Sequence, residues 1–475
     1  MKDQFAALGD VLKMMRRDTA STISPEMQSP FGKYTSMTMI LMLEQMALWL
    51  VQDGNRELHA ARARMIERLG GDDSVSVDGL HRDFEDHSGN GLVLSRLIEK
   101  RLAKAPCDEI TPLVSAIAQD ELAWLNAERS AVAKQTERDA SLISQVEFPI
   151  NCQTLDCYFE RSEVFKGYRA QSVWQIPGGY SKDTYMISVV DRDEHARDIV
   201  LRRDFPAGPT ETSAADEFGI LSKLSILGLP VARPLEAVHD RAVLGQPFLV
   251  VERVPGENAA DHFDQDPQLA RSVCYQLADT LGRLHALDPV ALGLTTGDVG
   301  GPADQIRTNL EQWKSFWKRN RRTGSPMVEA AFLWLEANIP ADVSRLVAVH
   351  GDARQHNVMI ENGRLTALLD WEFIHAGDPA EDLEYTKIYT APYVEWTDFM
   401  NVYLSAGGVR ASDSGSRFYE VFRAVRNFIC CDVAWSGFAT GTYPVNKLAV
   451  QGLVYRRDFL RWIGEALIRV TSSCN

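Results

Sequence analysis

The sequence predicts an α+β fold in three consecutive parts: a helical segment, a β-rich lobe and a larger α-rich lobe. Through residues 1–147, apolar residues recur at spacings of three and four, as in Met37–Leu50, without good strand candidates. Short β-like runs begin after Phe148-Pro149, and helical patterns dominate again beyond about residue 268. We therefore expect domains at 1–147, 148–254 and 255–475.

Composition places the chain among ordinary globular proteins. Its 475 residues are 45% hydrophobic, 24% charged and 9% aromatic, which is typical of a chain that buries a large core. The 50 Lys and Arg residues are outnumbered by 65 Asp and Glu residues, so the net charge is −15. General nucleic-acid binding depends on a cationic surface, and we expect no nucleic-acid partner.

Cysteine usage and hydropathy indicate a cytoplasmic protein. The seven cysteines form neither a Cys-x-x-Cys pair nor the even framework of secreted domains. The most apolar stretch, Met37–Val51, contains Glu44 and Gln45 and is shorter than the roughly 20 residues of a membrane-spanning helix. We expect a buried helix there and no membrane partner.

Three short runs predict strands of the β-rich lobe: Tyr185–Val190, Asp198–Leu201 and Phe248–Val251. Before the first run, Gly178-Gly179 predicts a tight turn in which backbone N–H groups can approach phosphates. An ordinary hairpin is the alternative for such a pair, so the turn alone does not identify a phosphate site.

The most informative segment lies between two apolar runs, Leu346 to Trp371. It contains Asp352, then Asn357, and then Asp370 at the end of the second run. Phosphoryl transfer needs a carboxylate that orients the attacking hydroxyl and oxygen ligands that hold Mg²⁺ on the nucleotide phosphates. These three residues can supply both. A single Asp in a loop is more often a turn residue, but His-Gly-Asp followed by Asn and Asp at this spacing is specific.

With these motifs, residues 160–475 resemble the aminoglycoside phosphotransferase and choline kinase family, whose members have a two-lobed, protein-kinase-like fold. The resemblance implies an ATP- and Mg²⁺-dependent kinase that phosphorylates an alcohol group. It gives Asp352 the role of catalytic residue, and it makes Asn357 and Asp370 the metal ligands.

The same resemblance implies a nucleotide site in the β-rich lobe. The turn with Gly178, Gly179 and Ser181 would contact the phosphates, and Arg202 stands where kinases carry a phosphate-binding Lys. Arg can take this role because its guanidinium binds phosphate bidentately. Three further residues complete the expected site: Glu217 as the ion-pair partner of Arg202, and Glu252 and Val254 at the hinge, where backbone groups would bind adenine. For Glu217 a solvated helix residue is the alternative.

Two further residues near the motif have other roles. The stretch Gly377–Leu383 matches the segment that braces the catalytic loop in the family, which gives Asp382 a structural role. Arg354 follows Asp352 by two positions. It has two interpretations, contact with a substrate phosphate or an ion pair with Glu372, and the sequence leaves both open.

The loop residues resemble a branch of the family associated with acyl-CoA dehydrogenases, which implies a small hydroxylated acceptor and specifically a hydroxyacyl-CoA. A basic helical segment supports an anionic acceptor, because it would attract phosphates and repel a polycationic antibiotic. Its basic residues are Lys314, Lys318, Arg319, Arg321 and Arg322. A solvated basic helix face is the alternative.

Two other functions stay open: an aminoglycoside or macrolide antibiotic kinase, and a nucleotide-binding pseudokinase or scaffold whose helical segment binds a partner. The retained Asp352, Asn357 and Asp370 argue against a pseudokinase, and only Arg202 in place of Lys speaks for it. Residues 1–147 carry no catalytic pattern. We expect an accessory domain there, through which the chain could form homo-oligomers.

Overall fold

The computed structural model describes residues 114–115, 118–119, 150–176, 179, 181–206, 208, 210–296, 300–321, 324–439, 448 and 450–472. One compact unit comprises residues 146–309 and 339–420, and a second includes residues 310–338 and 421–475. Of the helical segment expected at 1–147, residues 114, 115, 118 and 119 are described and are helical. The rest of that prediction lies outside the described residues, and the expected domain boundaries stay predictions.

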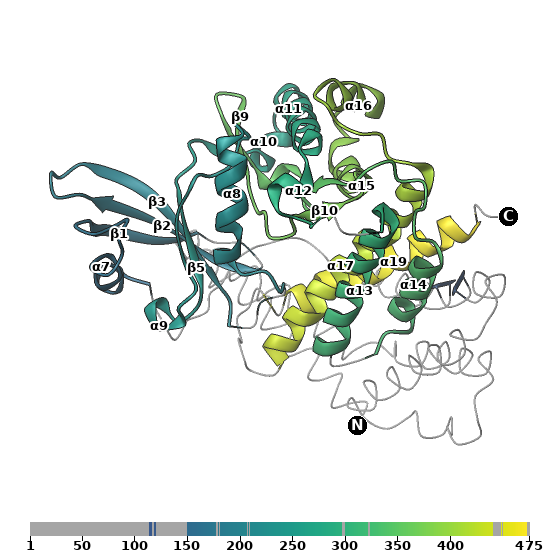
Figure 1. Ribbon diagram of the computed structural model, residues 1–475, viewed down its shortest axis with the longest axis horizontal. Coiled ribbons are helices and arrows are strands. Elements are labelled where there is room, and N and C mark those ends of the chain that lie inside the picture. Colours follow the sequence, from purple (N-terminus) through teal and green to yellow (C-terminus); the bar gives the residue numbers. More distant parts are fainter. Residues whose placement is uncertain are drawn as a thin grey trace, which may run out of the picture. The chain divides into compact units, whose positions relative to one another are not determined.

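A five-stranded antiparallel sheet forms the β-rich lobe of the first unit (Figure 1). Its strands follow the order β1-β2-β3-β5-β4. Their bounds are β1 Arg169–Ile176, β2 Lys182–Val190, β3 Ala196–Asp204, β4 Pro234–Val238 and β5 Phe248–Glu252. The three strands expected from the sequence are confirmed as parts of β2, β3 and β5, and the α+β class is confirmed with them.

Strand β5 is apolar throughout because both of its faces are covered. Phe248 and Val250 pack in a cluster with side chains of helix α7 (Cys152–Phe159). Leu249 and Val251 pack in a different cluster, with side chains of the helices that follow the sheet. Alternate residues of a strand point to opposite faces, so an uninterrupted apolar run identifies a strand buried on both sides.

Shorter helices flank the sheet. Helix α7 begins after Asn151, whose side chain accepts a hydrogen bond from the Thr154 N–H at 3.0 Å. Helix α9 (Arg241–Leu244) contributes Leu244 to the same apolar cluster as α7. On the way from β3 to β4, the short 3-10 helix η3 (Ala214–Asp216) leads into α8 (Glu217–Ile226).

The register of β2 and β3 sorts their charged residues onto two faces. Lys182 pairs with Asp204, and Thr184 pairs with Arg202. Side chains two positions apart share a face, so Lys182, Arg202 and Asp204 lie on one side of the hairpin. The intervening Arg203 lies on the other side, where it donates to the Leu244 carbonyl at 3.1 Å.

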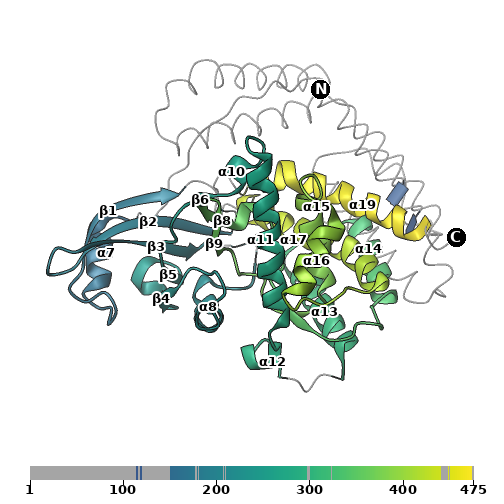
Figure 2. The same ribbon diagram turned by 90° about the horizontal axis from the view of Figure 1, so that it is seen from above.

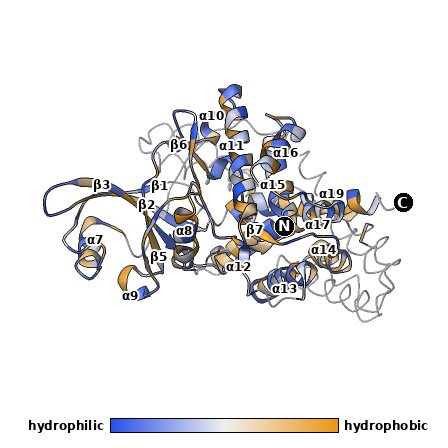
Figure 3. Ribbon diagram, turned by 45° about the horizontal axis from the view of Figure 1, so that its top comes forward, coloured by the Kyte–Doolittle hydropathy of each residue, from blue (hydrophilic) through white to orange (hydrophobic). Residues whose placement is uncertain are grey.

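The α-rich part of the first unit follows the sheet (Figure 2). Helix α11 carries hydrophilic and hydrophobic residues along its length (Figure 3), and its buried face includes Leu277, Leu281 and Leu284. Its first turn is capped by Asp266, which accepts from the Gln268 and Leu269 N–H groups. The helices of this part are α10 Ala260–Phe263, α11 Pro267–Ala286, α12 Pro289–Leu292, α15 Ala380–Thr390 and α16 Trp396–Ser405.

Short strands support the loops between these helices. Strands β6, β8 and β9 form one sheet, and β7 pairs with β10. Their bounds are β6 Glu257–Asn258, β7 Val347–Val349, β8 Val358–Glu361, β9 Arg364–Leu368 and β10 His375–Gly377. Between β8 and β9, Asn362 and Gly363 both have positive φ (51° and 75°), as a type I′ hairpin turn requires.

The remaining helices are α13 Pro302–Asn320, α14 Pro326–Ala337, α17 Asp413–Ala439, the π-helix η5 Gln451–Tyr455 and α19 Arg456–Ser472. Trp317 of α13 and Phe332 of α14 are fully buried and lie 5.8 Å apart between ring centroids. No helix in the described part of the chain has the length and apolar character needed to cross a lipid bilayer.

Two glycines, Gly256 after β5 and Gly219 in α8, offer a matched test of backbone packing. Gly256 has φ +99°, and a Cβ added there would lie 2.0 Å from the Ile360 carbonyl oxygen. We expect Gly256→Ala to lower the free energy of unfolding by about 2–3 kcal/mol, because it adds both backbone strain and a clash. Gly219 lies within α8, and a Cβ there would meet nothing within 4 Å.

The control Gly219→Ala should leave the protein unchanged or stabilise it by about 0.5–1 kcal/mol, because Ala favours a helix more than Gly does. Thermal and urea unfolding of both variants measure the difference. Equal stability of the two variants would contradict the close approach of Gly256 to β8.

Candidate active site

The loop between β7 and β8 is held at its base by one buried carboxylate. Asp382, at the start of α15, accepts hydrogen bonds from the His350 and Gly351 N–H groups, both at 2.7 Å. The same carboxylate contacts His285 Nε2 of α11 at 3.0 Å. Gly351 has φ +86°, a conformation that glycine adopts without strain. The structural role expected for Asp382 is therefore confirmed.

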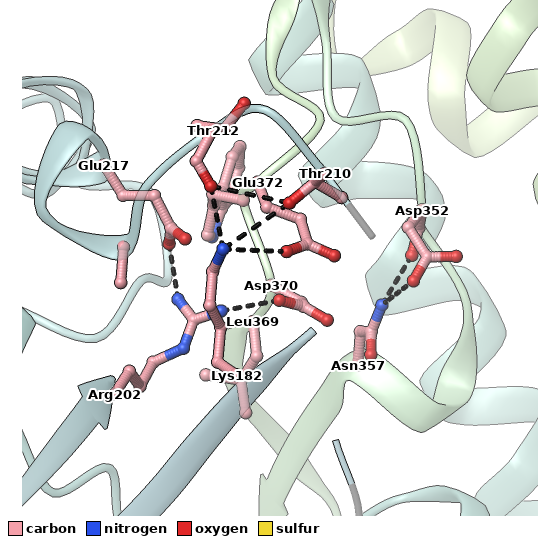
Figure 4. Close-up of polar contacts among 12 residues, drawn as sticks. Lys182, Arg202, Thr210, Thr212, Glu217, Asp352, Asn357, Leu369, Asp370 and Glu372 are labelled. Atoms are coloured by element: carbon pink, nitrogen blue, oxygen red, sulfur yellow. Dashed lines mark hydrogen bonds and ion pairs between the residues drawn. The ribbon is translucent and has the colours of Figure 1, made fainter. Parts of the chain in front are cut away.

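Asp352 and Asn357 face each other across this loop (Figure 4). Asn357, at the end of the 3-10 helix η4 (Gln355–Asn357), donates through Nδ2 to the Asp352 carboxylate at 2.7 Å and to its carbonyl oxygen at 2.8 Å. Both side chains are buried. Because Nδ2 makes both bonds, the amide oxygen of Asn357 remains as an acceptor or metal ligand.

His350 ties this loop to the segment that carries Asp370. Its Nδ1 accepts from the Asp352 N–H at 3.1 Å, so Nε2 carries the proton and donates to the Leu369 carbonyl at 3.0 Å. Burial lowers the pKa of His350, which keeps the ring neutral. Asp370 follows with φ +67°, an uncommon conformation for a residue with a Cβ that marks candidate functional positions.

Arg202 of β3 joins Asp370 to helix α8. Its guanidinium donates to Asp370 Oδ1 at 2.6 Å and, through the other terminal nitrogen, to Glu217 Oε2. The solvated alternative for Glu217 is wrong, because this side chain is fully buried. Burial acts to lower the pKa of Arg202, but the carboxylates of Glu217, Asp370 and Glu372 outweigh it and raise that pKa above its ordinary value. Burial raises the pKa of Glu217, and Arg202 opposes the rise.

The glycine turn lies between β1 and β2. Gly179 has φ +67°, so this position favours glycine, whereas Gly178 lies outside the described residues. Ser181 is buried and forms a side-chain hydrogen bond with Glu372.

The two hinge residues are placed at the end of β5 and just beyond it. The Glu252 carboxylate pairs with Arg233. The backbone N–H of Glu252 donates to the Arg233 carbonyl at 2.9 Å. This N–H is therefore already used within the protein. Val254 is partly buried against the apolar cluster that includes Leu249 and Val251.

Lys182 is a second cation beside Arg202 that the motifs did not identify. Its ammonium donates to the Thr212 carbonyl at 2.7 Å and lies 3.7 Å from Glu372 (Figure 4). It also lies 3.2 Å from Asp204. Its side chain is only 5% exposed. Burial and the nearby Asp370 raise the pKa of Glu372, and Lys182 opposes this. Strand alternation places Lys182 and Arg202 on one face of the hairpin, and this sequence pattern could have identified Lys182.

Arg354 contacts Asp352 rather than Glu372. Its Nε lies 3.3 Å from Asp352 Oδ1, so the interpretation as a partner of Glu372 is wrong. Tyr385 of α15, also absent from the motifs, forms a side-chain hydrogen bond with Asp352. Burial and the Asp352 charge raise the pKa of Tyr385 well above its ordinary value, so its hydroxyl stays protonated and donates. The Asp352 carboxylate is thus surrounded by donors.

The expected basic segment belongs to the second compact unit. Lys314 pairs with Glu336, and Arg321 pairs with Glu329 and lies over the Trp317 ring at 4.5 Å. Arg322 lies outside the described residues. Two cations of the segment therefore have carboxylate partners of their own, which weakens the argument that the segment attracts an anionic acceptor.

Comparison with known proteins finds one family. The model of the family described as phosphotransferase enzyme family matches residues 172–415. The chain is similar to acyl-CoA dehydrogenase family member 11 of Gallus gallus, with 31% identity over 230 residues, which are 47% of this chain and 29% of that protein. Viomycin phosphotransferase of Streptomyces vinaceus is 28% identical over 171 residues, 33% of this chain and 55% of that protein.

A solved structure gives the same fold. A crystal structure of a protein named as an aminoglycoside phosphotransferase, from Ralstonia eutropha, has a TM-score of 0.50 at 21% identity and covers 67% of this chain and 98% of that one. Among the curated relatives, the matched segment spans less than a third of acyl-CoA dehydrogenase family members 10 and 11. The kinase-like fold expected from the sequence is confirmed.

The buried carboxyl of Asp378, just before helix α15, predicts an effect of pH on stability. Asp378 is 1% exposed, accepts from the Ala380 N–H at 2.8 Å, and has its pKa raised to about 6 by burial. The folded protein then keeps a proton that the unfolded chain releases near pH 4. The free energy of unfolding should fall by about 2–3 kcal/mol as pH rises from 4 to 6.

Thermal unfolding across this range compares the wild type with Asp378→Asn, which keeps the acceptor oxygen but cannot titrate. The variant should show the smaller decline between pH 4 and 6. An equal decline in the free energy of unfolding for the wild type and Asp378→Asn would contradict the raised pKa of Asp378.

Proposed function

The chain belongs to the phosphotransferase enzyme family, and from this premise we propose that it is an ATP- and Mg²⁺-dependent kinase that phosphorylates a hydroxyl group of a small metabolite. The observation that carries the proposal is that Arg202 of strand β3 contacts Asp370 and that Asp352 is held by Asn357 on the neighbouring loop (Figure 4). Positioning and charge neutralisation account for most of the catalysis of phosphoryl transfer.

Asp352 orients the acceptor hydroxyl. Asn357 and Tyr385 hold its carboxylate in place, so an acceptor oxygen can be aligned with the terminal phosphorus. A bond forms between the acceptor oxygen and the γ-phosphorus while the bond from that phosphorus to the β–γ bridging oxygen breaks. The hydroxyl proton passes to Asp352, and ADP leaves.

The nucleotide phosphates bind the face of the β2–β3 hairpin that carries Lys182 and Arg202. Arg202 is charged and already aimed at Asp370, and the turn at Gly179 and Ser181 presents backbone N–H groups at the start of β2. Lys182 adds a second cation on the same face. Adenine binds backbone groups near Glu252 and Val254.

The charges of the site favour a divalent cation. Among the described residues, the carboxyl groups of Asp204, Glu217, Asp370 and Glu372 lie beside the two cations Lys182 and Arg202, and the raised pKa of Glu372 reflects the cost of a further negative charge there. Excess negative charge in a buried cluster is unfavourable unless a cation neutralises it. The Asn357 amide oxygen and the second oxygen of Asp370 suit Mg²⁺, which prefers oxygen ligands. When bound, Mg²⁺ supplies charge neutralisation on the phosphates.

The acceptor we propose is a hydroxyacyl-CoA or a related hydroxylated metabolite. The support is the similarity of 47% of this chain to part of acyl-CoA dehydrogenase family member 11. A second candidate is an antibiotic kinase, which the similarity to viomycin phosphotransferase favours. Measuring ADP formation with a hydroxyacyl-CoA, an aminoglycoside, a macrolide and a tuberactinomycin distinguishes the two.

The role of Asp352 predicts a separation of turnover from nucleotide binding. Asp352→Asn should lower kcat by at least about 100-fold, because the carboxylate no longer receives the proton. ADP affinity, measured by calorimetry, should stay within about threefold of the wild type. Near-native turnover in this variant would remove Asp352 from the mechanism, and binding of ATP without ADP formation in the wild type would favour a pseudokinase.

The role of Asp370 predicts a loss of metal dependence. Asp370→Asn keeps an oxygen that can accept from Arg202 but removes the charge, so the gain in ADP affinity on adding Mg²⁺ should shrink by about tenfold or more. Calorimetry in EDTA and in Mg²⁺ measures this gain. The matched control is Asp398→Asn, an exposed residue of α16, which should behave as the wild type. An unchanged gain in Asp370→Asn would contradict the metal site.

A further inference from the structure

A cavity outside the proposed active site lies where three segments of the first unit meet. The loop between α8 and β4, helix α11 and the turn between β8 and β9 line it, and its volume is about 680 Å³. Small-molecule sites have volumes of roughly 300–1,000 Å³. None of the described residues to which we assign a role in phosphoryl transfer lines this cavity. It is therefore a candidate binding site separate from Arg202, Asp352 and Asp370.

Hydrogen bonds hold the polar walls of this cavity in place. Gln276 of α11 donates through Nε2 to the Gly363 carbonyl at 2.9 Å, and its Oε1 accepts from the Leu365 N–H at 2.8 Å. Arg283, two turns further along α11, donates through Nη2 to the Gly228 carbonyl at 2.5 Å. Walls that are already fixed lose little conformational freedom when a ligand binds, which lowers the entropic cost of binding.

Two arginines, Arg283 of α11 and Arg364 of β9, give the cavity an excess of positive charge. Within the described part of the chain, neither guanidinium lies within ion-pair distance of a carboxylate. Each has five N–H donors, and the hydrogen bond to Gly228 uses one donor of Arg283. Asp279 is the only carboxylate among the described residues that line the cavity. Two cations against one anion favour a ligand with a negative charge.

The cavity also has an apolar wall. Tyr275 and Leu365 line it and are partly buried against the apolar cluster that includes Leu281 and Leu284. The ring of Tyr275 offers a flat apolar surface on which a planar group can pack. A hydrated inorganic ion has no apolar body that would use this surface. The apolar wall therefore favours an organic ligand over an inorganic one.

We propose that this cavity binds a small organic anion, whose phosphate or carboxylate group contacts Arg283 and Arg364 while a flat apolar body packs on Tyr275. Arginine suits this role because its planar fork donates parallel hydrogen bonds to either kind of group. A cationic ligand is unfavourable, since both arginines would repel it and would lose water without gaining an acceptor. This site goes beyond the proposed function and does not depend on kinase activity.

The test compares probes of similar size that differ in charge. Ligand-observed NMR measures the binding of phenyl phosphate, benzoate, benzyl alcohol and benzylamine to the full chain without nucleotide. Phenyl phosphate or benzoate should bind with a Kd of about 1 mM or lower. This anion should bind at least about tenfold more tightly than benzyl alcohol and benzylamine. The tighter of the two anions identifies phosphate or carboxylate as the group that the arginines bind.

Two variants of the lining should change the affinity for this anion in opposite directions. Arg364→Gln, at an exposed position, removes a cation and should weaken binding by about tenfold. Asp279→Asn, also at an exposed position, removes the repulsive carboxylate and should tighten binding by about two- to fivefold. The matched control is Arg271→Gln, at an exposed position of α11 outside the lining, which should bind as the wild type does.

Two further variants separate this cavity from the proposed active site. Ser272→Phe places a ring at an exposed position of the cavity wall without changing any charge, and it should weaken binding by about tenfold or more because the ring occupies the ligand's space. Asp370→Asn, in the proposed active site, should leave the affinity for the anion unchanged. Thermal unfolding of each variant checks that it is folded.

Three results would overturn the inference. One is the absence of binding of both anions at about ten times the expected Kd, and another is equal binding of benzyl alcohol and the anions. The third is anion binding that Asp370→Asn changes but Arg364→Gln and Ser272→Phe do not, because the probe would then occupy the proposed active site. None of these measurements involves ADP formation, so a protein without kinase activity would contradict the proposed function and leave this inference standing.

Discussion

The paired contact of Arg202 with Glu217 and Asp370 is the interaction on which the rest of the site depends. It joins strand β3, helix α8 and the loop after β9 through one buried guanidinium. Removing the cation would leave the fully buried Glu217 carboxylate without its partner, which is strongly destabilising. The sheet, helix α8 and the loop after β9 are thus held together by the same charge that we propose for phosphate binding.

The local geometry on both sides of this contact follows from elementary rules. Strand alternation puts Lys182 and Arg202 on one face of the β2–β3 hairpin and turns Arg203 to the other. On the side of Asp370, Asp382 uses its two carboxylate oxygens to hold consecutive N–H groups of the loop that carries Asp352. A loop with its backbone groups bonded to a buried acid keeps its side chains oriented without depending on a ligand.

Much of the fold and part of the site could be predicted from the sequence. The strands were predictable because burial on one or both faces leaves a periodic pattern, as in the apolar run of β5. Asp352, Asn357 and Asp370 were predictable because their spacing along the chain is a property of one short segment. The alternative pairing of Arg354 with Glu372 was wrong, because the sequence contains no pattern that reports the distance between residues on different loops.

The sequence by itself determined the α+β class, the family and the residues that form the centre of the candidate site, because all of these depend on local pattern and spacing. Only the tertiary structure decided which polar groups meet: Lys182 with Asp204 and Glu372, Arg354 with Asp352, and Tyr385 with the same carboxylate. These contacts join segments that are close only after the chain has folded. Their energies depend on burial and distance, neither of which residue order alone specifies.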